Sequence, residues 1–559
     1  MNENTLRDAN ALLRQGRRRE ALSHYESYLD ENPQSAEAWH NRGVTLAQMK
    51  RYAEALSCFD RALALRPDVA QAWSNRANAL FEMKRFEEAA SDYGRVLALD
   101  ENYPYARGYR LLARLWCCDW QGLAEEKTLI TEALQAGQPV MQPFGNLMVS
   151  GGPADQLRCA RIWMAQSQPV RPGPLWQGEI YRHDKIRVAY LSGDFLLHPV
   201  ALLMAGVFEH HDRSRFETIA VSYGADDGSR LRDRLEKAFD HFIDARAMSD
   251  FAIAQHLREM EVDIAVDLMG LTGDCRNGIL AFRPAPVQVN YLGFPGTMAV
   301  DHMDYIIADR IVIPDHERCH YAEKVVHLTD TYLATDSKRR IAARKPSRAE
   351  VGLPEEGLVF CSFNRAFKYS PEIFDVWMRV LAAVDGSVLW LPENNEAARR
   401  NLKREAEEAG IAPGRLVFAP RVDGDADHLA RLECADLFLD TLPNNAHTTA
   451  VDALWAGVPV LTLAGPTFAG RVAASLLCAA GLPELAVGSL ADYEDLAVKF
   501  GRDGEALGAL KAKLAANREN HPLFDTARFT KGLEAAYLTM RDRAAKGEAP
   551  THFAVEGSH

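Results

Sequence analysis

A gapless internal repeat dominates the first third of the chain. Residues 36–69 align with residues 70–103 at a spacing of 34, which places Trp39 on Trp73, and the preceding stretch keeps the same register. A period of 34 residues with two helices per unit is that of tetratricopeptide repeats. Since each unit buries its apolar face only against its neighbours, the repeat predicts a short α-helical solenoid over residues 1–115.

Solenoids of this kind present a concave face, and an asparagine recurs there. Asn41 and Asn75 occupy equivalent positions in consecutive repeats. An amide side chain offers both a donor and an acceptor to a peptide backbone. We therefore expect these two residues to bind a protein acceptor in the groove. The alternative is that they only cap or bridge helices.

Two series of short apolar strands follow the repeats, one between residues 185 and 313 and the other between residues 358 and 465. The connections within each series are long enough for helices, as parallel sheets require. Ligands of such sheets bind at the carboxyl ends of the strands. The expected order is a helical connector over 116–180, an α/β lobe over 181–343, a second α/β lobe over 344–520, a helix over 521–545 and a tail over 546–559, disordered from residue 551.

Composition excludes several classes of protein. The net charge of −13 argues against a nucleic-acid binder, which would carry a basic stripe. No apolar stretch reaches the roughly 20 residues that span a bilayer, and the polar N-terminus does not resemble a signal peptide. Nine scattered cysteines without a CxxC pair indicate buried thiols rather than disulfides or zinc. We expect a cytoplasmic protein with no membrane contact.

The stretch LFLDTLPNNAHTTAVDALWAG (437–457) carries the strongest chemical signal. A strand ends before the loop, and His447, Thr448 and Thr449 open a helix. Free amides and the helix dipole make such a helix start an anion site. Threonine hydroxyls add hydrogen bonds to a phosphate, and Asp452, one turn further, is placed to accept one from a ribose hydroxyl. An ordinary helix N-cap is the alternative.

Three further motifs follow strands. Arg365 and Lys368 are two cations suited to a diphosphate leaving group, although solvated surface cations are the alternative. The turn Pro295-Gly296-Thr297 lets backbone amides approach a ligand, since glycine adds no Cβ. His198 stands at a strand end against a proline, where a histidine suits proton transfer.

Taken together, these motifs resemble the O-linked N-acetylglucosamine transferase and SPINDLY family, the tetratricopeptide-fused family 41 glycosyltransferases. The resemblance rests on SGDFLLHP, FRPAPVQVNYLGFPGT, FNRAFKYSP and LFLDTLPNNAHTTAVDALWAGVPVLT, in order. It implies a GT-B fold of two Rossmann-like lobes. It also implies transfer of a sugar from a nucleotide-sugar donor to Ser or Thr hydroxyls of proteins, with inversion. No metal or other cofactor is expected, because no DxD motif accompanies these elements.

The resemblance implies two catalytic residues. His198 matches the active-site histidine, as a base or as a positioning group, and Lys368 matches the essential lysine at the diphosphate. His428 matches a histidine that packs on the nucleotide base, with Arg431 nearby, and Asp452 matches the aspartate of the ribose. The residues that we expect to bind the donor are Arg365, His428, Arg431, His447, Thr448, Thr449, Asp452, Pro295, Gly296 and Thr297.

Three departures from the family concern the donor. Arg365 stands where the N-acetylglucosamine transferases carry glutamine, Asp425 where they carry lysine, and Met269 where they carry asparagine. UDP-N-acetylglucosamine is the default donor, but SPINDLY members use GDP-fucose, and related flagellin glycosyltransferases use nonulosonic acid donors. The short solenoid fits a narrow client, for which flagellin is our hypothesis.

Two other classes of function remain open. A non-catalytic scaffold would keep the fold but lose the chemistry, and the presence of His198, Lys368 and the His447–Thr449 helix start counts against it. Transfer to a small molecule or glycan would need no solenoid, and the repeats count against that alternative.

Overall fold

The computed structural model describes residues 2–149, 151–168 and 173–556. The chain divides into two compact units. The first unit is Met1–Gly145 with Asn395–Leu402, and the second is Asn146–Asn394 with Lys403–His559. Neither the second unit nor the first contains, in the described ranges, a helix long and apolar enough to cross a bilayer.

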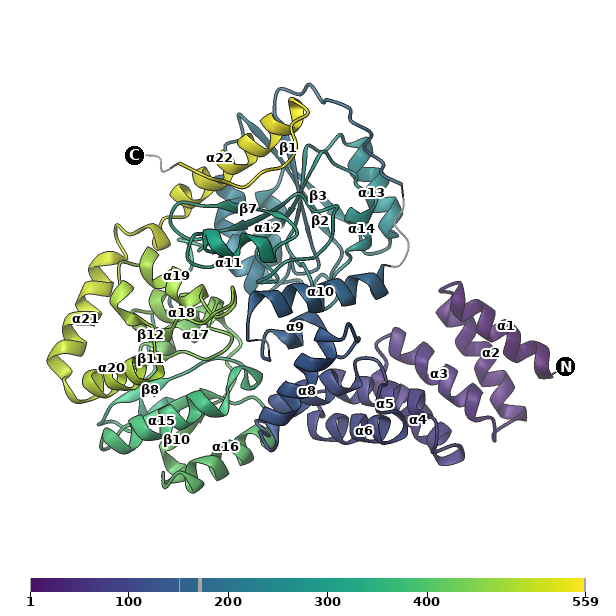
Figure 1. The fold of residues 1–559 in the computed structure, drawn as a ribbon, viewed down its shortest axis with the longest axis horizontal. Helices are drawn as coiled ribbons and strands as arrows, with labels where there is room; N and C mark the ends of the chain where they lie inside the picture. The colour runs from purple at the N-terminus through teal and green to yellow at the C-terminus, as the bar shows by residue number, and fades with distance from the viewer. Residues whose placement is uncertain (1, 150, 169–172, 557–559) are drawn as a thin grey trace. The chain divides into compact units, whose positions relative to one another are not determined.

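The first unit is the predicted helical solenoid (Figure 1). Its helices are α1 (Asn2–Arg14), α2 (Arg18–Glu31), α3 (Ala36–Gln48), α4 (Tyr52–Leu65), α5 (Ala70–Glu82), α6 (Phe86–Leu99), α7 (Ala106–Trp116) and α8 (Leu123–Gln135). The repeat is visible in the contacts. The indole nitrogens of Trp39 and Trp73 donate to the carbonyls of Pro33 and Pro67, each at 2.9 Å. The repeat prediction is therefore confirmed at the level of single hydrogen bonds.

A segment distant in sequence completes this unit. Ala397 packs in the core cluster that contains Phe86, with Trp116 against it. The amide of Asn401 donates to the carbonyl of Cys117 at 2.8 Å, and that of Asn395 to the carbonyl of Trp116 at 2.9 Å. These bonds satisfy carbonyls at the end of α7 that have no partner within the helix.

The boundary between the two units falls within α9 (Pro143–Asn146), and α10 (Pro153–Ser167) precedes the first lobe of the second unit. That lobe is an all-parallel sheet in the order β14-β7-β6-β5-β4-β1-β2-β3. Its strands are β1 (Ile186–Ser192), β2 (Phe216–Ser222), β3 (His241–Asp244), β4 (Ile264–Asp267), β5 (Val287–Asn290), β6 (Tyr305–Ala308), β7 (Lys324–His327) and β14 (Phe553–Ala554). The connecting helices are α11 (Pro199–His210), α12 (Arg230–Ala238), α13 (Asp250–Glu259) and α14 (Gly278–Ala281).

The second lobe is a smaller parallel sheet in the order β10-β9-β8-β11-β12-β13. Its strands are β8 (Val359–Cys361), β9 (Val388–Pro392), β10 (Leu416–Ala419), β11 (Leu437–Leu439), β12 (Val460–Leu463) and β13 (Ala486–Val487). The helices of this part of the chain are α15 (Pro371–Ala383), α16 (Glu396–Glu408), α17 (Asp425–Leu432), α18 (Thr448–Trp455), α19 (Val472–Ala479), α20 (Leu490–Arg502) and α21 (Gly504–Asn517). The expected fold class, a solenoid followed by two parallel α/β lobes, is confirmed.

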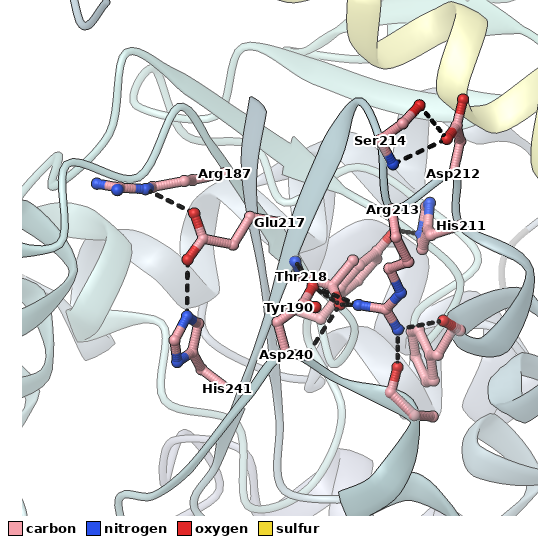
Figure 2. Close-up of polar contacts among 12 residues, drawn as sticks. Arg187, Tyr190, His211, Asp212, Arg213, Ser214, Glu217, Thr218, Asp240 and His241 are labelled. Atoms are coloured by element: carbon pink, nitrogen blue, oxygen red, sulfur yellow. Dashed lines mark hydrogen bonds and ion pairs between the residues drawn. The ribbon is translucent and has the colours of Figure 1, made fainter. Parts of the chain in front are cut away.

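The C-terminal end of the chain returns to the first lobe. Helix α22 (Thr526–Ala545) packs against α11, and its Glu534 accepts from His211, with Nδ1 to Oε1 at 2.9 Å. His211 also contacts the hydroxyl of Tyr190 on β1 at 2.8 Å (Figure 2). Because both His211 and Glu534 are buried, this chain of hydrogen bonds fixes α22 on the lobe.

The expectation of a disordered tail from residue 551 is wrong for residues 551–556. Phe553 and Ala554 form β14 and pair with Val326 and His327 at the edge of the sheet. The amide of Val325 donates to His552 Nδ1 at 2.8 Å. The edge of a parallel sheet offers unpaired backbone groups, and this short segment pairs with them. Residues 557–559 lie outside the described residues.

Candidate functional site

His198 caps the helix that follows the first strand of the first lobe. It is the N-cap of α11, and Pro199 occupies the first helical position, where a missing amide costs nothing. Its Nδ1 atom lies 3.4 Å from the amide of Val200 and 3.3 Å from Oδ2 of Asp194. The side chain is 39% exposed, so the imidazole is held by its own loop and still reaches solvent.

The surroundings of His198 keep the imidazole neutral. Burial, with a contribution from the charge of Arg365, lowers the pKa of His198 to about 4. Burial and the charge of Asp274 raise the pKa of Asp194 to about 6. Arg365 follows β8 of the second lobe, whereas His198 follows β1 of the first lobe, so the charge that acts on His198 comes from the other lobe. Both lobes of the second unit therefore contribute to one charged environment.

Lys368 lies at the end of a single 3-10 turn, Ala366–Lys368, after β8. Its Nζ donates to the carbonyl of Asn445 at 2.6 Å. Burial lowers the pKa of Lys368, and the nearby carboxylate of Asp440 opposes that shift. Burial and the charge of Lys368 together hold the pKa of His447 well below its ordinary value. The structure thus brings Lys368 beside the loop that the sequence marked as an anion site.

Asp440, which the sequence analysis passed over, organises that loop. It follows β11, and its Oδ1 accepts from the amides of Thr441 at 2.7 Å and Ala446 at 2.6 Å. Its Oδ2 accepts from the hydroxyl of Thr462 on β12 at 2.6 Å. The peptide bond between Leu442 and Pro443 is cis. The signal for Asp440 in the sequence is an aspartate directly after an apolar strand, LFLD.

The start of α18 has no side-chain cap. His447 is its N-cap residue and makes no capping hydrogen bond. Thr449 does not cap the helix either, because its hydroxyl donates to Oδ1 of Asn364 at 2.8 Å. Amides in the first turn of a helix that lack a side-chain acceptor are suited to an anion. The capping alternative for Thr448 and Thr449 is therefore not what the structure shows.

His428 and Arg431 lie together on α17. Arg431 places Nη2 3.0 Å from Nδ1 of His428, and its guanidinium lies 5.0 Å from the centroid of the Phe363 ring. A guanidinium only donates, so Nδ1 of His428 accepts and the proton resides on Nε2. Burial lowers the pKa of Arg431 to about 10. The imidazole also lies edge-on to Phe363, at 5.6 Å between centroids, which fixes the plane of the histidine ring.

Asp452 is buried and bonded to a residue that the sequence did not indicate. Its Oδ1 accepts from Nη1 of Arg339 at 2.6 Å, and its Oδ2 lies 3.7 Å from Nε2 of His428. Arg339 also binds Asp425, the position at which the family resemblance implied a lysine. A cation is therefore present beside the predicted nucleoside residues, although it comes from another segment of the chain.

The turn Pro295-Gly296-Thr297 is packed inside the first lobe. The hydroxyl of Thr297 donates to Oε2 of Glu323 at 2.5 Å, and the carbonyl of Gly296 accepts from Asn290 at 3.0 Å. All three turn residues are buried. The turn thus uses its polar groups to hold its own shape, and a contact between these residues and a donor stays a prediction.

In the solenoid, Asn41 and Asn75 connect neighbouring helices. The amide of Asn41 donates to Oδ1 of Asn10 at 3.0 Å, and that of Asn75 lies 2.9 Å from Nε2 of His40. This is the bridging arrangement given above as the alternative. An acceptor backbone would have to exchange with these bonds, so acceptor binding by the two asparagines stays a prediction.

Within the described ranges, no group of three or more histidine, cysteine or acidic side chains is arranged to hold a metal ion. Four cationic side chains lie near the strand ends: Lys368 and Arg365 after β8, and Arg339 and Arg431 near His428 and Asp452. Together with the fold, these features define a class, a solenoid-fused protein of two parallel α/β lobes with a cationic site where the strands end.

The family follows from direct comparison. The model of glycosyl transferase family 41 matches residues 175–345 and 334–533, and tetratricopeptide models match residues 6–57 and 34–102. The chain therefore belongs to glycosyl transferase family 41, as the resemblance indicated.

Its relatives include plant and bacterial proteins. The chain is 35% identical over 467 residues to the probable UDP-N-acetylglucosamine–peptide N-acetylglucosaminyltransferase SEC of Arabidopsis thaliana, covering 80% of this chain and 48% of that protein. It is 32% identical over 372 residues to the SPINDLY protein of the same plant, covering 66% and 40%. The chain thus spans about half the length of the curated relatives it matches. A solved mutant of the Thermobaculum terrenum O-GlcNAc transferase superposes with a TM-score of 0.69 at 28% identity, covering 98% of both chains.

Proposed function

We propose that the chain is a protein O-glycosyltransferase that moves N-acetylglucosamine from UDP-N-acetylglucosamine to Ser or Thr hydroxyls of a protein. The names of the matched relatives support this donor and acceptor class. The observation that carries the proposal is the site itself. A neutral histidine from the first lobe and a buried lysine from the second share the electrostatic field of Arg365.

The second lobe supplies the donor side. The diphosphate lies against the Nζ of Lys368 and the uncapped start of α18, with Arg365 as a further cation. When the bond between the anomeric carbon and the diphosphate breaks, negative charge develops on the leaving oxygen. Preorganised cations and amides stabilise that charge more strongly in the transition state than in the ground state. The protein's own cations supply this stabilisation, so the proposal includes no metal.

The first lobe supplies the acceptor side. The hydroxyl oxygen attacks the anomeric carbon from the face opposite the diphosphate, which inverts the configuration. Its proton passes to Nε2 of His198, and the nucleoside diphosphate leaves. This role requires that Nδ1 carry a proton and donate to Asp194, 3.3 Å away. If Nδ1 instead accepts from the amide of Val200, the histidine donates from Nε2 and only positions the substrate.

The solenoid is the proposed binding site for the protein acceptor. Asn41 and Asn75 would contact an extended acceptor segment, and a short solenoid favours a narrow client. Flagellin is the client that we propose to test first, and a nonulosonic acid nucleotide is the alternative donor. None of the nine cysteines forms a disulfide in the structure, which fits the reducing cytoplasm as the place of reaction.

A thermal-shift screen tests the donor class. Purified protein is melted with UDP, GDP or CMP and with their sugar conjugates. A ligand that binds only the folded state stabilises it by RT ln(1 + L/Kd), where L is the ligand concentration, and so raises Tm as that concentration exceeds Kd. We expect a shift with UDP and UDP-N-acetylglucosamine. A shift with CMP alone would replace the proposed donor with a nonulosonic acid nucleotide. No shift with any nucleotide would favour the non-catalytic scaffold.

A transfer assay tests the reaction. Full-length protein, flagellin and the donor identified by melting are incubated together, and intact-mass spectrometry follows the acceptor. We expect added mass equal to one or more sugar residues, lost in the Lys368→Ala variant. Release of UDP without acceptor modification would leave donor hydrolysis but contradict flagellin as the client.

A further inference from the structure

Arg339 lies between two carboxylates that the sequence places far from it. Its Nη1 donates to Oδ1 of Asp452 and its Nη2 to Oδ1 of Asp425, both at 2.6 Å, and its Nε lies 3.3 Å from Oδ2 of Asp425. The Arg339 side chain is 3% exposed. The segment that carries it is fixed as well, because the amide of Ala342 donates to the carbonyl of Ala426 at 3.0 Å.

The charge of Arg339 determines the protonation state of Asp452. Burial by itself raises the pKa of Asp452, but Arg339 and His428 act in the opposite direction, and the pKa lies below the ordinary aspartate value. Burial disfavours the charge of Arg339, yet the two carboxylates raise its pKa. Without the guanidinium, Asp452 and Asp425 would be two like charges close together, and a proton would settle on the pair.

The bond to Arg339 also sets which oxygen of Asp452 is open. Oδ1 accepts from Arg339, whereas Oδ2 faces His428, whose Nε2 is 3.7 Å away. Nε2 carries the proton because Arg431 donates to Nδ1 of the same ring. The carboxylate therefore presents one ionised oxygen next to a fixed imidazole, and an ionised carboxylate oxygen is a strong acceptor for a hydroxyl.

We propose that Arg339 is a positioning residue of the nucleoside subsite, which holds Asp452 ionised and turned so that Oδ2 accepts from a ribose hydroxyl of a nucleoside diphosphate. The inference rests on the proposed function, since it needs a nucleotide at His428 and Asp452. The inference goes beyond the proposed function because it assigns the ionisation and orientation of Asp452 to Arg339, a residue of the segment between the two lobes. Arg339 itself touches neither the ligand nor the reacting atoms.

Charged groups face Asp452 from two parts of the chain. Arg339 faces it from the segment after β7, and Asp425 and His428 face it from α17. Helix α18 also packs against α19 and β12, whose sequences VAASLLCA and VLTL carry no acidic or basic side chain. Arg431 faces the far side of the His428 ring, and Arg518 lies over the Trp455 ring of α18. Of these basic groups, His428 is the one that faces the carboxylate of Asp452 once Arg339 is removed.

The test compares ligands that differ by one hydroxyl. Isothermal titration at pH 6 gives the Kd of UDP, 2′-deoxy-UDP and 3′-deoxy-UDP for the full-length protein. A hydrogen bond to a charged group contributes about 1.5–3 kcal/mol, which is about a 10- to 100-fold preference for UDP over the analogue that lacks the bonded hydroxyl. We expect that preference in the unmodified protein and a preference below about threefold in Arg339→Met, because a protonated Asp452 accepts more weakly.

Three further variants make the result specific to the charge of Arg339. Arg340→Met removes the adjacent exposed arginine and should keep the full preference. Arg339→Lys keeps a cation but lacks the several fixed N–H donors of a guanidinium, so it should retain part of the preference for UDP. The double variant Arg339→Met/Asp425→Asn removes the like charge as well, so Asp452 ionises again and the preference should return in part. In Arg339→Met the preference should also rise between pH 6 and pH 8.5, as Asp452 loses its proton.

The outcomes separate the two proposals. An unchanged preference in folded Arg339→Met, checked by circular dichroism, overturns the role of Arg339 while leaving the nucleotide site in place. Equal binding of UDP and both analogues by the unmodified protein overturns the ribose contact of Asp452 and this inference with it. Failure of the unmodified protein to bind UDP, GDP or CMP contradicts the proposed function first. If Arg339→Met does not fold, Arg339→Lys and the double variant give the same comparison.

Discussion

The carboxyl ends of the two sheets are built in different ways. In the second lobe, Asp440 accepts three hydrogen bonds of 2.6–2.7 Å, and Thr449, Arg431 and Arg339 each have a bonded partner. In the first lobe, His198 is held by two contacts of 3.3 and 3.4 Å and is 39% exposed. The proposed donor side is thus held by more and shorter hydrogen bonds than the proposed acceptor side. Preorganisation matters most where charge develops in the transition state.

The largest effect is expected where the second lobe stabilises the leaving group. Lys368→Met should lower kcat about 10²- to 10³-fold, the range found when one electrostatic stabiliser is removed. Steady-state release of UDP measures it. Lys546→Met, at an exposed position after α22, is the matched control and should keep full activity. Activity within threefold of the unmodified protein in Lys368→Met would remove the main difference between the lobes.

Two carboxylate variants, one at each strand end, test whether the two lobes hold their sites differently. Asp440→Asn disturbs a buried network, so we expect the free energy of unfolding to fall by about 3–5 kcal/mol, as for a broken buried pair. Asp194→Asn disturbs a half-exposed contact and should cost less than about 1 kcal/mol, while kcat falls. Urea unfolding followed by circular dichroism measures both. Equal losses of stability would show that the two strand ends are held alike.

The sheets themselves were largely predictable from the sequence, and the reason is burial. Central parallel strands are covered on both faces and read as apolar runs, as in β1 and β4. The missed strands are β3, β7, β13 and β14, which lie toward or at the sheet edges. β7 has four residues, of which three are buried. β3 has exposed ends and half-buried middle residues, whereas β13 and β14 each have two residues. Such segments owe their form to pairing with a neighbour, which leaves little pattern in the sequence.

The residues of the site also fall into two groups, those that the sequence indicated and those that it did not. Residues next to strand ends, such as His198, Lys368 and His447, were indicated because their positions follow from the strands. Arg339 was not, because its partners lie 86 and 113 residues away and no local pattern connects them. The family resemblance showed that Asp425 stands where relatives carry a lysine. It did not show that Arg339 brings a cation to the same place. Long-range pairs of this kind need the fold before they can be recognised.

A smaller effect is expected in the pH dependence of activity, which tests the role of Asp194 in the first lobe. The pKa of Asp194 is raised to about 6, so its carboxylate is present above pH 6 and is lost as the pH falls through 6. The pKa of His198 is lowered to about 4, so the imidazole stays neutral throughout that range. We expect kcat/KM for the acceptor to fall below pH 6 because Asp194 no longer orients Nδ1. The profile of Asp194→Asn should be flat there and low throughout. An acid limb that persists in that variant would assign the titration to another group.

The smallest effect is expected where acceptor binding is spread over the solenoid. Asn41→Ala/Asn75→Ala removes one side chain from each of two repeats, and each hydrogen bond contributes about 0.5–1.5 kcal/mol. KM for the protein acceptor should rise about 5- to 150-fold for the two bonds together, while donor hydrolysis by the second unit stays unchanged. Asn102→Ala, in the exposed turn after α6, is the matched control. Because Asn41 and Asn75 bridge helices in the free solenoid, the double variant must first melt within a few degrees of the unmodified protein. Unchanged KM in a protein that melts normally would leave these asparagines with the bridging role alone and would move acceptor recognition away from the repeated positions.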